Sequence, residues 1–164
     1  MSTPTTHQAN RDLAVVDRQV AVDANTLPSE AELADWIDRV LAHHPAETRH
    51  EVTVRLVDVS ESQALNRDYR GKDTPTNVLS FPFEAPPEVP IPLLGDLVIC
   101  HAVVAQEAQQ QHKPLAQHYA HMVIHGTLHL LGYDHIEDDE AEVMEKMERD
   151  ILAGLEIPDP YLES

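Results

Sequence analysis

The chain has 164 residues, one cysteine and a formal net charge of −18, from 29 acidic and 11 basic side chains. This length predicts a single domain, and no apolar run approaches the roughly 20 residues that span a bilayer. The charge argues against general binding to polyanions, so neither a membrane nor a DNA partner is expected.

The N-terminal residues lack the apolar core of a signal peptide, and the single cysteine, Cys100, cannot form an internal disulfide. A soluble, cytoplasmic protein is therefore expected. Twelve acidic residues lie from Asp134 to the end, whereas Arg67, Arg70 and Lys72 cluster in the middle of the chain. Nucleic acid bound at this basic cluster should be recognised selectively, because the net charge weakens non-specific binding.

The first half of the chain predicts two strands and two helices. Residues 1–11 read as a disordered arm, and the valine-rich segment 13–22 as a first strand. Ser29 and Glu32 form a capping box before a helix, whose expected core residues are Leu33, Trp36, Ile37, Val40 and Leu41. Segment 50–59 predicts a second strand, and Ser60 is expected to cap a short helix that ends near Tyr69.

The second half predicts two more strands and three helices. A polar loop at 70–77 precedes a strand at 78–83, which Pro82 marks as an edge, and a fourth strand follows at 93–100. Helices are expected at 101–112, from Pro114 to about Leu131, and from Asp138 to about Ala153, the last with Val143, Met144, Met147, Ile151 and Leu152 as its apolar side. The prediction is an α+β (mixed α/β) domain at 12–154, with one four-stranded mixed sheet, about five helices and a loose tail at 155–164.

Three histidines, His125, His129 and His135, lie around the end of the fourth predicted helix, which runs from Pro114 to about Leu131. The first two are one helical turn apart on the same face, and a turn at Gly132 would bring His135 back toward them. Three imidazoles with an open fourth position are the ligands of a catalytic zinc, although copper, nickel and iron also accept imidazole. His118 and His121 precede them on the same helix, but the spacing to His135 favours the later set.

The histidine spacing is also that of metzincin proteases, which place a glutamate after the first histidine as the general base. Here that residue is Gly126, which cannot accept a proton. The sequence therefore predicts a metal site, but it does not predict peptide hydrolysis by the usual mechanism of zinc proteases.

Three motifs resemble the bacterial YbeY family in order and spacing. They are the stretch from His125 to His135, Y-R-G-K-D-T-P-T-N-V-L-S-F-P-F-E from Tyr69 to Glu84, and L-G-D-L-V-I from Leu94 to Ile99. The resemblance spans roughly residues 50–153. It implies a single-strand-specific endoribonuclease that acts in ribosomal RNA maturation, above all at the 3′ end of the small-subunit RNA, and in ribosome quality control. It further implies one Zn²⁺ held by His125, His129 and His135, with Arg70 as the catalytic arginine.

An arginine facing a phosphodiester is chemically reasonable, because its planar fork binds two phosphate oxygens, and Lys72 would help to position the backbone. The proton acceptor stays open among a metal hydroxide, the 2′-hydroxyl of the substrate and Asp134, which is better placed in sequence to orient His135. Two other functions remain: a ribosome assembly factor with a non-catalytic zinc, acting through a small-subunit ribosomal protein or an assembly GTPase, and a metzincin-like metalloprotease.

Overall fold

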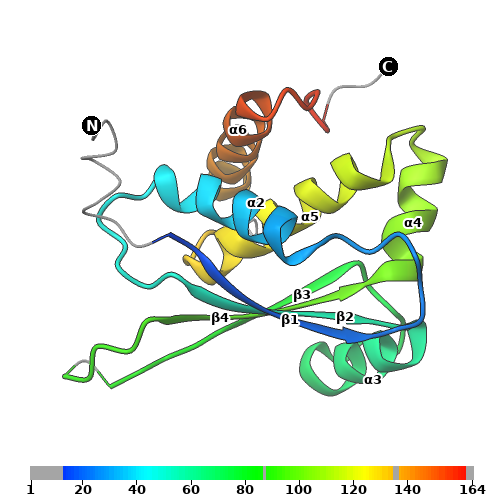
Figure 1. Ribbon diagram of the computed structural model, residues 1–164, viewed down its shortest axis with the longest axis horizontal. Coiled ribbons are helices and arrows are strands. Elements are labelled where there is room, and N and C mark those ends of the chain that lie inside the picture. Colours follow the sequence, from blue (N-terminus) through cyan, green and yellow to red (C-terminus); the bar gives the residue numbers. More distant parts are fainter. Residues whose placement is uncertain (1–12, 87, 135–136, 162–164) are drawn as a thin grey trace.

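The computed structural model describes residues 13–86, 88–134 and 137–161. Within these ranges it contains a four-stranded sheet and five helices (Figure 1). Their order is β1 (Val15–Ala21), α2 (Glu30–Ala42), β2 (Glu51–Val57), α3 (Val59–Arg70), β3 (Val78–Pro82), β4 (Leu93–Cys100), α4 (His101–Gln110), α5 (Leu115–Leu130) and α6 (Asp138–Gly154). The predicted α+β class with a single mixed sheet is therefore confirmed.

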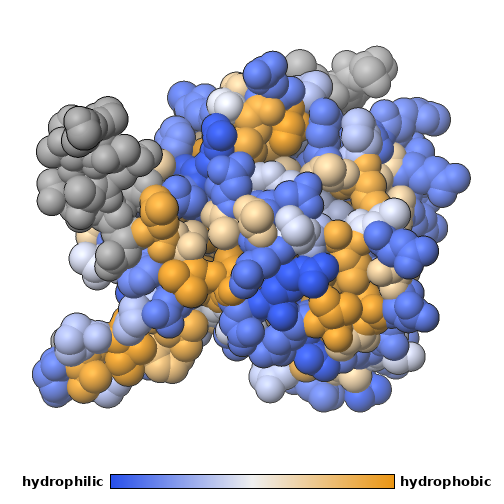
Figure 2. Space-filling view, in the orientation of Figure 1, coloured by the Kyte–Doolittle hydropathy of each residue, from blue (hydrophilic) through white to orange (hydrophobic). Residues whose placement is uncertain are grey.

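The strands lie in the order β1-β2-β4-β3, which the sequence did not predict. β1 pairs in parallel with β2 and β2 with β4, whereas β3 is antiparallel to β4. β3 is thus an edge strand, as Pro82 indicated, since proline cannot donate a hydrogen bond to a further strand. In Figure 2, apolar side chains are exposed on the segment that projects beyond β3 and β4, where Val89 is 44% exposed.

Four helices, α2, α4, α5 and α6, lie on one face of the sheet, and α3 covers the other (Figure 1). α5 contacts α2, α4, α6, β3 and β4, so most of its side chains are buried. The larger core cluster fills the space under α2 and α5 with residues such as Leu97, Ile124 and Leu128. A smaller cluster of Val57, Leu79, Val98 and Cys100 lies on the face of α3. The central helix is consequently fixed on several sides.

The irregular step in β4 lies at Gly95, where the register with β2 shifts between Glu51 and Val52. A Cβ at Gly95 would lie 2.5 Å from the carbonyl oxygen of Phe81 and 2.7 Å from Leu130 Cδ2. Only glycine therefore permits β3 and the end of α5 to approach β4 this closely.

Two local predictions were wrong. The N-cap of α3 is Asp58, whose carboxylate accepts the Glu61 N–H, and the predicted cap Ser60 lies inside the helix. Asp58 can act as the N-cap because its backbone is extended and its carboxylate is as good a hydrogen-bond acceptor as a serine hydroxyl. Val143, predicted as core, is 56% exposed on α6 because it lies beside the buried stripe that contains Met144. The capping box of α2 is confirmed, and its five predicted core residues are buried.

The predicted arm at 1–11 and the proposed ligand His135 lie outside the described residues, so their predictions stay open. Residues 155–161 of the predicted tail are described, and the Tyr161 hydroxyl donates to Glu148 on α6. No helix in the described ranges is long and apolar enough to cross a bilayer.

Candidate functional site

A cleft of about 780 Å³ opens where the end of α3, the edge strand β3 and the last turns of α5 meet. Its lining includes the aromatic rings of Tyr69 and Phe81 and the charged or metal-binding candidates Arg70, His125, His129 and Asp134. These residues are up to 65 positions apart in sequence (134 − 69). Three of the four residues expected at the site, Arg70, His125 and His129, therefore share one cavity, and the fourth, His135, is not described.

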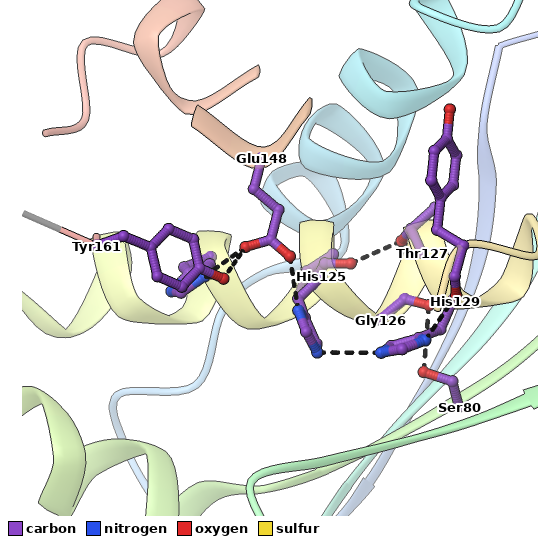
Figure 3. A network of polar contacts seen from close by, with 10 residues as sticks. Ser80, His125, Gly126, Thr127, His129, Glu148 and Tyr161 are labelled. Atoms are coloured by element: carbon purple, nitrogen blue, oxygen red, sulfur yellow. Dashed lines mark hydrogen bonds and ion pairs between the residues drawn. The ribbon is translucent and has the colours of Figure 1, made fainter. Parts of the chain in front are cut away.

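His125 and His129 point toward each other from successive turns of α5, with their Nε2 atoms 3.1 Å apart (Figure 3). The rings cross at 81°, with centroids 4.6 Å apart. This is the geometry expected from i, i+4 spacing on a helix. Both side chains are half-buried, so the pair faces the cleft while its stems remain packed in the protein.

The other nitrogen of each ring faces an acceptor. His125 Nδ1 lies 2.7 Å from Oε2 of Glu148, and His129 Nδ1 lies 2.9 Å from the carbonyl oxygen of Tyr133. Neither a carboxylate nor a carbonyl can donate, so the proton of each neutral ring belongs on Nδ1. The lone pairs are then on the two Nε2 atoms, which are directed at the same region.

These two histidines fit a metal ion. Two lone pairs at 3.1 Å repel each other unless a cation or a proton lies between them. Tetrahedral zinc with bonds of about 2.0–2.1 Å places two nitrogens about 3.3 Å apart, close to the observed separation. Metal-binding histidines also characteristically donate their second N–H to a carboxylate or backbone carbonyl, as both do here. Among the described residues no group of three potential ligands converges, so the complete tripod stays a prediction that depends on His135.

A tight turn after α5 fixes His129. Gly132 has φ +104°. Its N–H donates to the backbone carbonyl of His129, and the Tyr133 N–H donates to the backbone carbonyl of Leu128, which together form a Schellman motif. The turn directs the Tyr133 carbonyl at His129 Nδ1. The Tyr133 hydroxyl in turn lies 2.9 Å from Nε2 of His44 at the end of α2. His44 thus helps to hold the turn beside the site.

Glu148 is the residue that sequence reasoning missed. It lies on α6, 23 positions after His125, and its side chain is fully buried. Burial alone would raise its pKa, but hydrogen bonds from His121, His125 and Tyr161 hold the pKa at about 2. A signal was present, because Glu148 interrupts the apolar stripe of α6, four residues after Met144. A buried carboxylate in such a stripe needs partners.

The two earlier histidines of α5, His118 and His121, are hydrogen-bonded to carboxylates. His118 Nε2 lies 2.8 Å from Oε1 of Glu107 on α4, and His121 Nε2 lies 3.0 Å from Oε1 of Glu148. Both histidines are buried, and neither is among the residues that line the cleft. The preference for the later histidines is thereby supported, since His125 and His129 are the pair that faces the cavity.

Close packing of α5 against the sheet explains why position 126 is a glycine. A Cβ there would lie 2.8 Å from Leu97 Cδ2 and 3.2 Å from both Val78 Cγ2 and Ser80 Oγ. Ser80 also donates to the Gly126 carbonyl at 3.1 Å, so the helix backbone rests directly on β3 and β4. The glutamate that zinc proteases carry at this position has no room here. The absence of that base is thus built into the contact between α5 and the sheet.

Arg70 is the last residue of α3, exposed at the cleft. Buried side chains of the same helix bind the following loop: Ser62 accepts the Thr76 N–H and donates to its carbonyl, and Asn66 donates to Thr74. The helix end and the loop are therefore held together as a rigid wall. Within the described ranges Arg70 has no ion-pair partner, and Lys72 is exposed and does not line the cleft.

Two comparisons with known proteins indicate one family, and a third finds a similar solved structure. The family model described as Endoribonuclease YbeY matches residues 15–156. A protein of Chromohalobacter salexigens named endoribonuclease YbeY is 67% identical over 150 residues, which cover 90% of this chain and 97% of that protein. The solution structure of a protein from Thermotoga maritima has a TM-score of 0.50 and 26% identity, covering 89% of this chain and 99% of that chain.

Proposed function

Because the chain belongs to the endoribonuclease YbeY family, we propose that it cleaves single-stranded RNA with one zinc ion held by His125, His129 and His135. The observation that carries this proposal is the convergence of His125, His129 and Arg70 on one cleft. A zinc ion at this site would polarise a phosphodiester and activate water near neutral pH. The imidazole donors fit zinc, and the choice of zinc over copper, nickel or iron follows from the family resemblance.

Arg70 binds the phosphate in this proposal. Its guanidinium offers two parallel N–H donors to the non-bridging oxygens and offsets the negative charge that develops as the phosphorus becomes pentacoordinate. The position suits that role, since the end of α3 is fixed by its loop and the arginine faces the same cavity as the histidines. The rigid support limits the entropy lost when substrate binds.

Tyr69 and Phe81 give a physical reason for a preference for single strands. Tyr69 is 67% exposed and meets Phe81 edge to face, with ring centroids 5.1 Å apart. Both rings line the cleft beside Arg70. Unpaired bases stack on such aromatic faces, whereas bases in a duplex are already stacked on each other. The rings would thus hold bases next to the phosphate that Arg70 binds.

The cellular role follows from the family resemblance rather than from the cleft. We propose that the substrate is ribosomal RNA, with maturation of the small-subunit 3′ end and ribosome quality control in the cytoplasm as the setting. A small-subunit ribosomal protein and an assembly GTPase are the proposed partners. The negative net charge supports a requirement for these partners, because a chain with 29 acidic and 11 basic residues binds RNA weakly without additional contacts.

Proteolysis is not favoured, because Gly126 leaves no space for the glutamate base of a zinc protease. The experiment that tests the proposed function compares three substrates with one purified preparation: a single-stranded ribosomal RNA fragment, the same sequence in a duplex, and an unfolded protein. We expect cleavage of the single strand alone, its loss with a chelator, and its return with added zinc. Cleavage that is unaffected by the chelator, or that is equal on the duplex, would refute the proposal.

A further inference from the structure

Glu148 places a carboxyl group in the interior of the protein. Its side chain has no exposed surface, and within the described ranges no lysine or arginine pairs with it. The neighbouring Arg149 lies instead 3.6 Å from Asp159. A buried carboxylate is costly unless donors surround it, so an isolated one on an apolar stripe indicates a specific task.

The donors around Glu148 all belong to the candidate site or lie next to it. Oε2 accepts from His125 Nδ1 at 2.7 Å, and Oε1 accepts from His121 Nε2 at 3.0 Å and from the Tyr161 hydroxyl. Figure 3 shows the carboxylate between Tyr161 and His125. One oxygen thus serves the candidate ligand, and the other is held by two side chains that keep the carboxylate from rotating.

We infer that Glu148 is a positioning residue of the metal site, which fixes the tautomer and direction of His125. This inference rests on the proposed function, because it presupposes that His125 binds a metal. It assigns His121 and Tyr161 a role as well: they anchor Glu148 rather than the metal. Tyr161 lies beyond residues 15–156 that match the family, so the segment after α6 completes this network.

The physical effect follows from where the His125 proton is held. With Nδ1–H bound to a carboxylate, the imidazole donates more electron density through Nε2 and cannot turn to present its protonated side. Removal of such a carboxylate typically lowers metal affinity about 10–100-fold. A Gln at this position keeps the shape but loses the charge, and its amide can turn a donor toward His125.

The matched control is the pair of His118 and Glu107, which has the same chemistry on the same helix. His118 Nε2 lies 2.8 Å from Glu107 Oε1, and both His118 and His121 are buried. Glu107→Gln removes a carboxylate from a buried histidine of α5, as Glu148→Gln does, although Glu107 is 29% exposed and Glu148 is fully buried. It should not alter a metal site that it does not touch. The two variants separate positioning of the metal from a general role in folding.

The experiment measures zinc affinity by competition with a chromophoric chelator for wild type, Glu148→Gln and Glu107→Gln, together with thermal unfolding of each. The inference predicts a zinc dissociation constant about 10–100-fold higher for Glu148→Gln and one within about twofold of wild type for Glu107→Gln. Nitrogen NMR of the zinc-free wild type should place the neutral His125 proton on Nδ1, a result that does not depend on any variant folding.

Equal zinc affinity in wild type and Glu148→Gln would overturn the inference, and so would a His125 proton on Nε2. Equal losses of zinc affinity in both variants would assign Glu148 to folding alone and also overturn it. A wild type that binds no zinc would overturn the proposed metal together with the inference. A wild type that binds zinc and cleaves RNA while Glu148→Gln binds zinc equally well would remove the inference alone.

Discussion

Arg67 and Arg70 are both exposed on the last turn of α3, and only Arg70 lines the cleft. Arg67 lies instead 3.3 Å from Asp68 and 3.9 Å from Asp73. Exposed ion pairs of this kind contribute little, about 0–1 kcal/mol. The sequence alone could not choose between these neighbouring arginines on charge, and the resemblance of the Tyr69–Glu84 motif was needed to select Arg70.

Arg70→Ala should lower kcat/KM for single-stranded RNA about 100–1000-fold, or about 2.7–4 kcal/mol, because the charge that develops on the phosphate loses its bidentate partner. Zinc content and thermal stability should be unchanged, since the side chain is exposed. Arg67→Ala is the control and should cleave like wild type. Equal activities of the two variants would contradict the role assigned to Arg70.

At the scale of elements, the turn after α5 needs a positive φ at Gly132 and also positions a partner of His129. Gly132 has φ +104° and Gly71, after α3, has φ +72°, and at both positions a Cβ would meet nothing within 4 Å. The cost of a side chain at either position is therefore conformational, about 1–2 kcal/mol. The two turns differ in what they hold, because only the first directs a carbonyl at His129.

Gly132→Ala should therefore lower both the free energy of unfolding, by about 1–2 kcal/mol, and the affinity for zinc. Gly71→Ala should lower the free energy of unfolding by a similar amount and leave zinc affinity unchanged. Urea unfolding and chelator competition measure the two quantities on the same samples. If the Gly132 variant keeps wild-type zinc affinity, the turn is not what positions His129.

Comparison of the predicted with the observed elements shows which features of the fold and the site can be predicted from the sequence. Periodicity and capping predicted the four strands and the helices, because each signal is local. The two histidines were found in the same way, one helical turn apart. Glu148 was missed because its partner His125 is 23 positions away and only the packing of α6 on α5 joins them. The strand order was equally hidden, since it depends on which strands pair across long connections.

At the scale of the whole molecule, stability should depend on pH through the buried His118. Burial lowers the pKa of His118, although Glu107 opposes this. The unfolded chain then binds more protons than the folded one as the pH falls below about 6.5, so folding weakens on acidification. The stabilising contribution is present above that pH and is lost as the pH falls toward the lowered pKa.

His118→Gln should reduce this acid sensitivity, because Gln can donate to Glu107 without titrating. Urea unfolding at several values between pH 7.5 and 5.5 gives the slope, to which one such proton contributes at most about 1.4 kcal/mol per pH unit. The difference between wild type and variant removes the contributions of the remaining histidines. Identical slopes would show that His118 does not take part in the acid response.

The first turn of α6 concentrates part of the negative charge of the protein. α6 begins with Asp138, Asp139 and Glu140, and Figure 1 shows this helix on the side of α5 away from the sheet. The cleft lies instead between α5, β3 and the end of α3. The charge totals and the local cluster of basic residues can be read from the sequence, whereas the contact of α6 with the site through Glu148 and His125 depends on the fold.

The central claim is that histidines of α5 bind the metal that RNA cleavage requires. The most direct measurement determines zinc content and single-stranded RNA cleavage on the same preparations of wild type, His129→Ala and His43→Ala, the last an exposed histidine at the end of α2. We expect one zinc and cleavage in wild type and His43→Ala, and loss of both in a folded His129→Ala. A His129→Ala protein that retains its zinc and cleaves at the wild-type rate would contradict the account.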